Sequence, residues 1–198
     1  MNDVKAVLRQ GLAGLGLAAS AEQVDALERY LSELLRWNQR INLTAARTVD
    51  DAARHVLDSA AIVAHIPEAA GRLLDVGSGG GLPAAVIAVL RPEIEVVAIE
   101  PVHKKHAFLQ QVRRAVPTPN LTALAERIAD HEGRDYDVAT SRATFALPEW
   151  LAIGSGLVRA GGLVLGMEGA EQIELPPGAS RHPYPLDDRA RAIIVLRS

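Results

Sequence analysis

The pattern of apolar and polar residues changes near Pro67. Before that point, the stretch Val24–Leu35 carries apolar residues at helical spacing, and the pair Ser20 and Gln23 ahead of it matches a helix capping box. Residues 1–67 are therefore predicted to be a helical extension packed on a core formed by the rest of the chain.

After Pro67, short apolar runs alternate with helical patterns. Strands are predicted at residues 72–76, 95–99, 121–124, 136–140, 163–167 and 189–196, the last of them paired with 181–186. Helices are predicted at residues 48–65, 83–90, 102–116 and 147–158. Strands that alternate with helices favour an α/β, doubly wound, Rossmann-like fold in residues 68–198. We expect seven strands in a mostly parallel sheet, with a closing hairpin that adds one antiparallel edge strand.

A glycine cluster follows the first predicted strand, with Asp75, Gly77, Gly79 and Gly81 at alternate positions. Glycine lets a backbone turn tightly and approach a ligand closely, and the helix behind the loop offers free N–H groups. The dinucleotide fingerprint needs a third glycine where Leu82 stands. The pattern instead resembles the first motif of S-adenosylmethionine-dependent methyltransferases. A carboxylate is useful beside that cofactor, which carries cationic groups and no phosphate.

Glu100 ends the second predicted strand. An acid at this place binds the ribose hydroxyls of adenosine cofactors. It therefore supports an adenosine ligand without choosing between nicotinamide cofactors and S-adenosylmethionine.

Composition excludes several classes of chemistry. The chain has no cysteine, which excludes disulfides, thiolate metal sites and cysteine nucleophiles. A net charge of −3 argues against a protein that coats nucleic acid by bulk charge. The first residues lack a signal-peptide pattern, and no apolar run approaches the ~20 residues of a membrane span. We expect a cytoplasmic protein with no membrane partner, and a monomer.

Four further segments extend the resemblance: Trp37–Thr44, Arg54–Ser59, Lys104–Leu109 and Ser141–Ala143. Together with the glycine loop and in this order, they resemble the bacterial small-subunit ribosomal RNA guanine-N7 methyltransferase family, also called glucose-inhibited division protein B. The resemblance implies methyl transfer from S-adenosylmethionine to N7 of a guanine in the decoding-region loop of 16S ribosomal RNA.

The resemblance also implies roles for single residues. Gly77 and Leu82 match cofactor-contacting positions of the loop, Ile128 and Ala129 match a pair close to the adenine, and Arg142 matches an arginine after the fourth strand. That arginine is our candidate for positioning cofactor or substrate. The family usually has an acid where Ala129 stands, and often a serine where Pro101 stands. The first departure removes any contact that the acid's side chain makes.

The reaction implied by the resemblance does not need the catalytic groups that the chain lacks. N7 of guanine has a lone pair and no proton, so alignment can replace a general base. Carbon-5 methylation of cytosine usually requires a cysteine. Methylation of an amino group usually uses an Asn/Asp-Pro-Pro-aromatic motif, and residues 140–143 read Thr-Ser-Arg-Ala instead. These absences favour a ring nitrogen, or a substrate that is not a nucleobase.

Basic residues are candidate RNA contacts. The strongest are Lys104, Lys105 and Arg54, and for each the plainer interpretation is a solvated helix face. His55 and Asp58 share a helix face, but two candidate ligands are no metal site. We expect them to make structural hydrogen bonds, and we predict no metal.

Three other functions stay open at this point. A small-molecule methyltransferase explains the loop and Glu100 but not the basic clusters. A nicotinamide-dependent oxidoreductase is disfavoured by Leu82. A non-catalytic module would bind S-adenosylmethionine or RNA without turnover.

Overall fold

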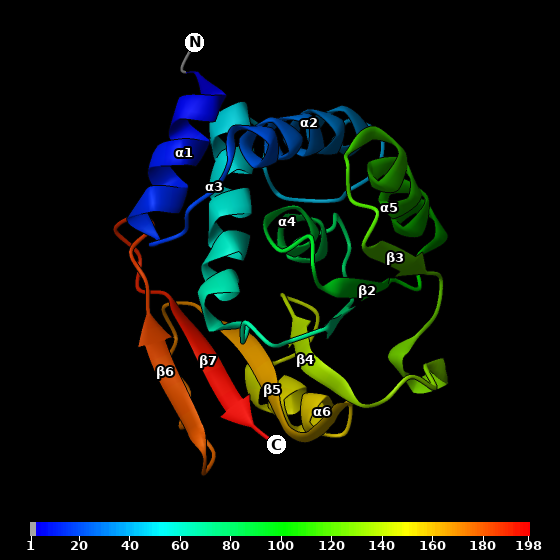
Figure 1. Ribbon diagram of the computed structural model, residues 1–198, viewed down its shortest axis with the longest axis vertical. Coiled ribbons are helices and arrows are strands. Elements are labelled where there is room, and N and C mark those ends of the chain that lie inside the picture. Colours follow the sequence, from blue (N-terminus) through cyan, green and yellow to red (C-terminus); the bar gives the residue numbers. More distant parts are fainter. Residues whose placement is uncertain (1–2) are drawn as a thin grey trace.

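The computed structural model describes residues 3–198 (Figure 1). Its helices are α1 (Val4–Gly14), α2 (Ala21–Asn38), α3 (Val49–Ala60), α4 (Ala84–Leu90), α5 (His103–Ala115) and α6 (Leu147–Ser155), with the 3-10 turns η1 (Ala61–His65) and η2 (Ile128–Asp130). Its strands are β1 (Arg72–Val76), β2 (Glu95–Ile99), β3 (Leu121–Leu124), β4 (Tyr136–Ser141), β5 (Val158–Glu168), β6 (Ala179–Pro183) and β7 (Ala192–Arg197).

The predicted fold class is confirmed. The sheet has seven strands in the order β3-β2-β1-β4-β5-β7-β6. The pairs from β3 to β5 are parallel, whereas β7 is antiparallel to both of its neighbours. The antiparallel strand therefore lies one place inside the edge, and β6 forms the edge itself.

Local signals in the sequence account for the helix starts. Ser20 and Gln23 form the predicted capping box of α2, and Thr48 and Asp51 form a second one at the start of α3. The helix predicted to reach His65 ends as an α-helix at Ala60 and continues as η1.

Several predicted boundaries were wrong. The strand predicted at residues 163–167 is longer and begins at Val158, as β5, and the strand predicted at 189–196 begins only at Ala192, as β7. The helix predicted at residues 147–158 ends at Ser155, because Val158 already pairs with Tyr136 at the start of β5. The outer strand predicted at 181–186 is β6 at Ala179–Pro183.

The sheet separates two apolar clusters. Because side chains alternate along a strand, Leu73 faces one cluster and Leu74 the other. The larger cluster lies under α1 to α5, and the smaller one contains Trp150 and Leu151 of α6. Figure 1 shows α6 below the sheet and the other helices above it. Helices on both faces are the doubly wound arrangement that the sequence predicted.

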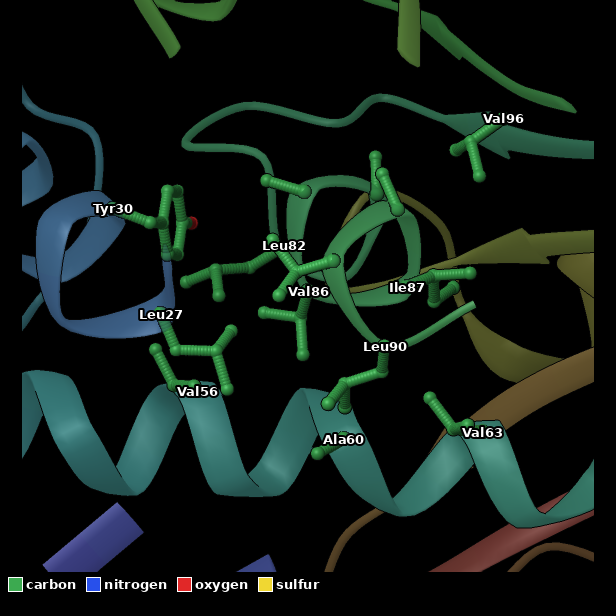
Figure 2. Close-up of a cluster of buried hydrophobic side chains, with 14 of the residues drawn as sticks. Leu27, Tyr30, Val56, Ala60, Val63, Leu82, Val86, Ile87, Leu90 and Val96 are labelled. Carbon is green, nitrogen blue, oxygen red and sulfur yellow. The ribbon is translucent and has the colours of Figure 1, made fainter. Parts of the chain in front are cut away.

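Helix α4, directly behind the glycine loop, is the centre of the larger cluster. All of its residues are apolar and buried, as expected of a helix with no solvent-facing side. Figure 2 shows Val86 of α4 facing Leu27 of α2 and Val56 of α3, and Leu90 of α4 facing Ala60 of α3. The N-terminal helices therefore hold the start of α4, and with it the loop, against the sheet.

None of the helices in residues 3–198 combines the length and the apolar composition needed to cross a bilayer. The division at residue 67 into an extension and a core stays a prediction, although one apolar cluster contains residues from both parts.

Candidate active site

The site lies where the strand order of the sheet reverses. From β1 the chain runs outward through β2 and β3, and β4 then pairs with the other side of β1. In open α/β sheets, ligands bind outside the carboxyl ends of the two strands that flank such a point. Here those ends carry the glycine loop after β1 and the Ser141-Arg142-Ala143 segment after β4.

The glycine loop has the backbone that its sequence requires. Gly77, Gly79 and Gly81 all have positive φ, and at Gly77 (φ 72°) a Cβ atom would lie 2.3 Å from Thr144 Oγ1. Gly77 N–H donates to Ile99 O at 2.9 Å, which ties the loop to the end of β2. Gly77 is therefore needed both for its φ and for the close approach of the β4–α6 loop.

Tyr30 anchors the same loop from α2, a role that the sequence did not reveal. Its hydroxyl donates to Gly80 O at 2.6 Å, and the side chain is fully buried. Burial raises the pKa of this phenol, so the donor stays protonated. In the sequence, Tyr30 is one more apolar-face residue of a helix, so no local pattern marks it.

Asp75 is completely buried at the end of β1. Ala84 N–H donates to its Oδ2 at 3.3 Å, whereas its Oδ1 is buried without any hydrogen-bond partner. Burial raises the pKa of this carboxyl to about 7, and the negative charge of Glu100 adds to the rise. A buried carboxylate oxygen with no donor favours a cationic or hydrogen-bond-donating ligand beside it.

Glu100 lies at the end of β2 and is also buried. Its two carboxylate oxygens accept from Gly79 N–H and Val102 N–H, each at 2.8 Å. A carboxylate has about four acceptor sites, so each oxygen retains capacity for a hydroxyl donor. The acid thus orders the glycine loop, and its remaining acceptor capacity is chemically compatible with the predicted ribose contact.

The other predicted cofactor residues lie at the same edge of the sheet. Glu100 N–H donates to Leu124 O at 3.0 Å, which brings the end of β3 beside the loop. Ile128 and Ala129 follow in η2, the first half-buried and the second exposed. Leu82 is buried at the start of α4. Their cofactor contacts stay predictions.

Arg142 is held against α3 rather than extended into solvent. Its Nη1 donates to Ser59 Oγ at 2.8 Å, His55 O at 3.2 Å and Asp58 Oδ2 at 3.4 Å. Two segments of the sequence resemblance, Arg54–Ser59 and Ser141–Ala143, therefore meet in space. Ser141 joins β4 to β1 as well, since its hydroxyl donates to Val76 O at 2.8 Å.

Asp58 connects this arginine to the C-terminal hairpin, which sequence reasoning missed. Its Oδ1 accepts from Tyr184 Oη and from Arg191 Nη1, both at 2.7 Å. Burial first, and then the adjacent Asp58 charge, raises the pKa of Tyr184. Asp58 thus neutralises two arginines at once, which explains why an acid is tolerated in a nearly buried place.

The Trp37–Thr44 segment shapes the back of the loop. The Asn38 side chain forms hydrogen bonds with the backbone of Leu43, Thr44 and Ala46. Thr44 Oγ1 lies 2.6 Å from His55 Nδ1 in a further hydrogen bond. The structural role expected for His55 is confirmed, and burial lowers the pKa of its ring. Trp37 packs on Phe108 of α5 with ring centroids 5.7 Å apart, and Asn42 is exposed.

The candidate RNA contacts lie on the surface. Lys104 and Arg54 are exposed and Lys105 is half-buried, the lysines in the first turn of α5 and the arginine on α3. Arg54 borders a surface hollow that it shares with Arg189 and Arg191 of the C-terminal segment. Within residues 3–198, no three potential metal ligands of the His, Cys, Asp or Glu type come together.

Comparisons with known proteins agree with this geometry. The family model described as rRNA small subunit methyltransferase G matches residues 23–175. A protein of that name from Bordetella avium is 40% identical over 87% of this chain and 81% of its own length, and one from Chromobacterium violaceum is 38% identical over 87% and 84%.

Among solved structures, the chain resembles magnesium protoporphyrin IX methyltransferase from Synechocystis with bound SAM, at a TM-score of 0.58 and 16% identity over 91% of this chain and 99% of that one. It also resembles a putative O-methyltransferase from Klebsiella pneumoniae, at a TM-score of 0.56 and 13% identity over 85% and 90%. At such identities the likeness shows the fold alone.

Proposed function

The chain belongs to the rRNA small subunit methyltransferase G family, and we propose that it transfers a methyl group from S-adenosylmethionine to N7 of one guanine in the decoding-region loop of 16S ribosomal RNA. The contact between the two loops at the switch point carries this proposal. Thr144 of the β4–α6 loop donates to Gly77 O at 3.3 Å, two residues after Arg142. A binding site for the methyl donor on the glycine loop and a binding site for the methyl acceptor beside Arg142 would therefore be neighbours.

The residues present fit S-adenosylmethionine. The unpartnered Oδ1 of Asp75 suits a cofactor that carries an amino group and a sulfonium, and would be a liability beside a pyrophosphate. Glu100 retains acceptor capacity for ribose hydroxyls. Gly77, Gly79, Gly81 and Leu82 would contact the cofactor along the loop, with Ile128 and Ala129 near the adenine.

S-adenosylmethionine supplies an electrophilic methyl group when bound. Its methyl group would pass to the lone pair of guanine N7 while the sulfur kept the electron pair of the broken bond, so no residue of the protein would have to take up a proton. The protein therefore needs to align two reactants rather than supply a base. Arg142 is the positioning group in this account, held in place by its bonds to α3. Lys104, Lys105 and Arg54 would bind phosphates around the target through their surface side chains.

A ribosomal substrate implies that the protein works in the cytoplasm, and we propose that it does so as a monomer. The test uses labelled S-adenosylmethionine with small subunits, and with naked 16S RNA, from cells that lack the endogenous modification. Label in the RNA of either substrate is expected. If label enters neither RNA while the cofactor binds, the substrate is not ribosomal RNA, and a small-molecule acceptor or a binding module takes its place. If NAD binds and S-adenosylmethionine does not, the cofactor assignment fails as well.

A further inference from the structure

A pocket of about 270 Å³ opens beyond the carboxyl ends of β4 and β5. We refer to it as the Phe145 pocket, and its lining residues include Asp58, Arg142, Phe145, Trp150, Tyr184 and Arg191. We propose that it receives the target guanine, stacked on Phe145 and read by Asp58, an inference that rests on the proposed function.

The pocket adjoins the predicted methyl-donor site through one short loop. Thr144 contacts Gly77 on the glycine loop, and the next residue, Phe145, lines the pocket. Ala143 between Arg142 and Thr144 has φ 56°, a left-handed backbone that L residues rarely adopt. Beyond this turn, Thr144 contacts the glycine loop and Phe145 lines the pocket, so the two consecutive side chains serve the two sites. A base in the pocket would thus be a neighbour of the group that methylates it.

The Phe145 ring offers a flat apolar surface on which a base in the pocket could stack. It is half-buried, and its ring lies nearly parallel to that of Trp150, at an interplanar angle of 18° and 6.0 Å between centroids. Trp150 is 2% exposed, and its Nε1 donates to Leu165 O at 2.9 Å, so this support is fixed. An aromatic ring that is backed on one side and borders a cavity is the usual partner of an unstacked RNA base.

Asp58 is the carboxylate in the pocket with spare acceptor capacity. Its Oδ1 holds Tyr184 and Arg191, whereas its Oδ2 accepts only the 3.4 Å contact from Arg142. Glu168 also lines the pocket, but Arg181 donates to both of its oxygens and Ile173 N–H to one of them, so it has less acceptor capacity left than Asp58. Guanine N1–H and N2–H are donors that suit a carboxylate, whereas adenine presents a bare N1 lone pair to it. Asp58 therefore favours guanine over adenine.

A guanine bound to Asp58 through its N1 edge also keeps N7, the atom that is methylated, free. N7 lies on the side of the purine away from N1 and N2, so a carboxylate bound to the N1 edge does not compete for the N7 lone pair. An arginine donating to N7 would suppress the reaction. The positive charges of Arg142 and Arg191 are instead engaged by Asp58, which holds them at the pocket wall.

The test uses Trp150 as a reporter. The chain has two tryptophans, so Trp37→Phe leaves Trp150 as the sole one. With saturating S-adenosylhomocysteine, GMP should quench Trp150 fluorescence, IMP should bind several-fold more weakly for lack of the amino group, and AMP more weakly still. Phe145→Leu should weaken GMP binding about 10- to 100-fold, as expected for loss of base stacking. Phe145→Tyr keeps the ring and should retain binding.

The same variants are then assayed on small subunits, with cofactor affinity measured separately by calorimetry. We expect Phe145→Leu to lower kcat/KM at least tenfold with unchanged S-adenosylhomocysteine binding, and Phe145→Tyr to stay near wild type. Equal affinity for GMP and AMP, no quenching by GMP, or competition between GMP and S-adenosylhomocysteine would each overturn the pocket assignment. Normal methylation by Phe145→Leu would do the same and leave the proposed function standing. Failure of the wild-type protein to methylate any ribosomal RNA would instead remove the function itself.

Discussion

The buried carboxyl of Asp75 makes the stability of the protein depend on pH in a predictable direction. Its folded pKa of about 7 lies above the ordinary 3.8, so the native state holds a proton that the unfolded state releases between these values. A raised folded pKa means that stability falls as pH rises through this window and levels off above it. Asp75→Asn cannot ionise and removes this dependence.

The size of the effect follows from the two pKa values. A rise from 3.8 to about 7 corresponds to roughly 4 kcal/mol in full, at about 1.4 kcal/mol for each pH unit. Between about pH 5 and pH 8, the free energy of unfolding of wild type should fall by about 2–3 kcal/mol relative to Asp75→Asn. Every other group titrates alike in both proteins and cancels in the difference.

Urea unfolding at several pH values in this range measures the difference directly. A constant gap between the two proteins would refute the buried, proton-holding state of Asp75. The same carboxyl should ionise when the cationic amino group of a ligand arrives beside it. Near pH 6, calorimetry of S-adenosylhomocysteine binding in buffers of different ionisation enthalpy should therefore report proton release from wild type, and less release from Asp75→Asn.

Three further predictions follow from individual contacts. Arg142→Ala should abolish methyl transfer while the cooperative unfolding transition persists, and near-normal turnover would remove Arg142 from the site; Arg159→Ala, which breaks a surface ion pair with Asp137, is the matched control and should stay active. Joint replacement of Lys104 and Lys105 by alanine should reduce the slope of log K against log salt for RNA binding by about 2, measured by filter binding. Tyr30→Phe leaves Gly80 O without its donor, and urea unfolding should show a loss of about 1–3 kcal/mol.

The lysine pair has a matched control. Arg9 and Arg29 are exposed on α1 and α2, and their joint replacement by alanine removes the same charge as the lysine pair. If it flattened the salt dependence equally, the effect would be one of net charge rather than of contact. An unchanged stability of Tyr30→Phe would show that Gly80 O finds another donor.

Local chemistry is what made much of the fold predictable. The bounds of β1, β2 and β3 follow from short apolar runs between turn residues, and α2 and α3 begin where their capping boxes stand. The glycine loop was visible for the same reason, since its residues are consecutive. The end of α6 could not be predicted in this way, because the pairing of Val158 with Tyr136 depends on the sheet and overrides the local pattern.

The contacts that build the site were mostly invisible in the sequence. Asp58 meets Tyr184 and Arg191 across more than 120 residues of chain, and Tyr30 meets Gly80 across 50. Such pairs have no local signature, because ordinary residues become partners only when the sheet brings α3 and the C-terminal hairpin together. The sequence resemblance pointed to Arg142 but not to the side chains that hold it.

The position of the transferred methyl group tests the account most directly. Ribosomal small subunits from cells without the native modification are incubated with the protein and labelled S-adenosylmethionine, and the RNA is digested to nucleosides and separated. The account predicts label in 7-methylguanosine alone, at one position of 16S ribosomal RNA. Label on an exocyclic amino group, on carbon, or on a ribose hydroxyl would contradict it, because each requires proton removal that this site is not built to perform.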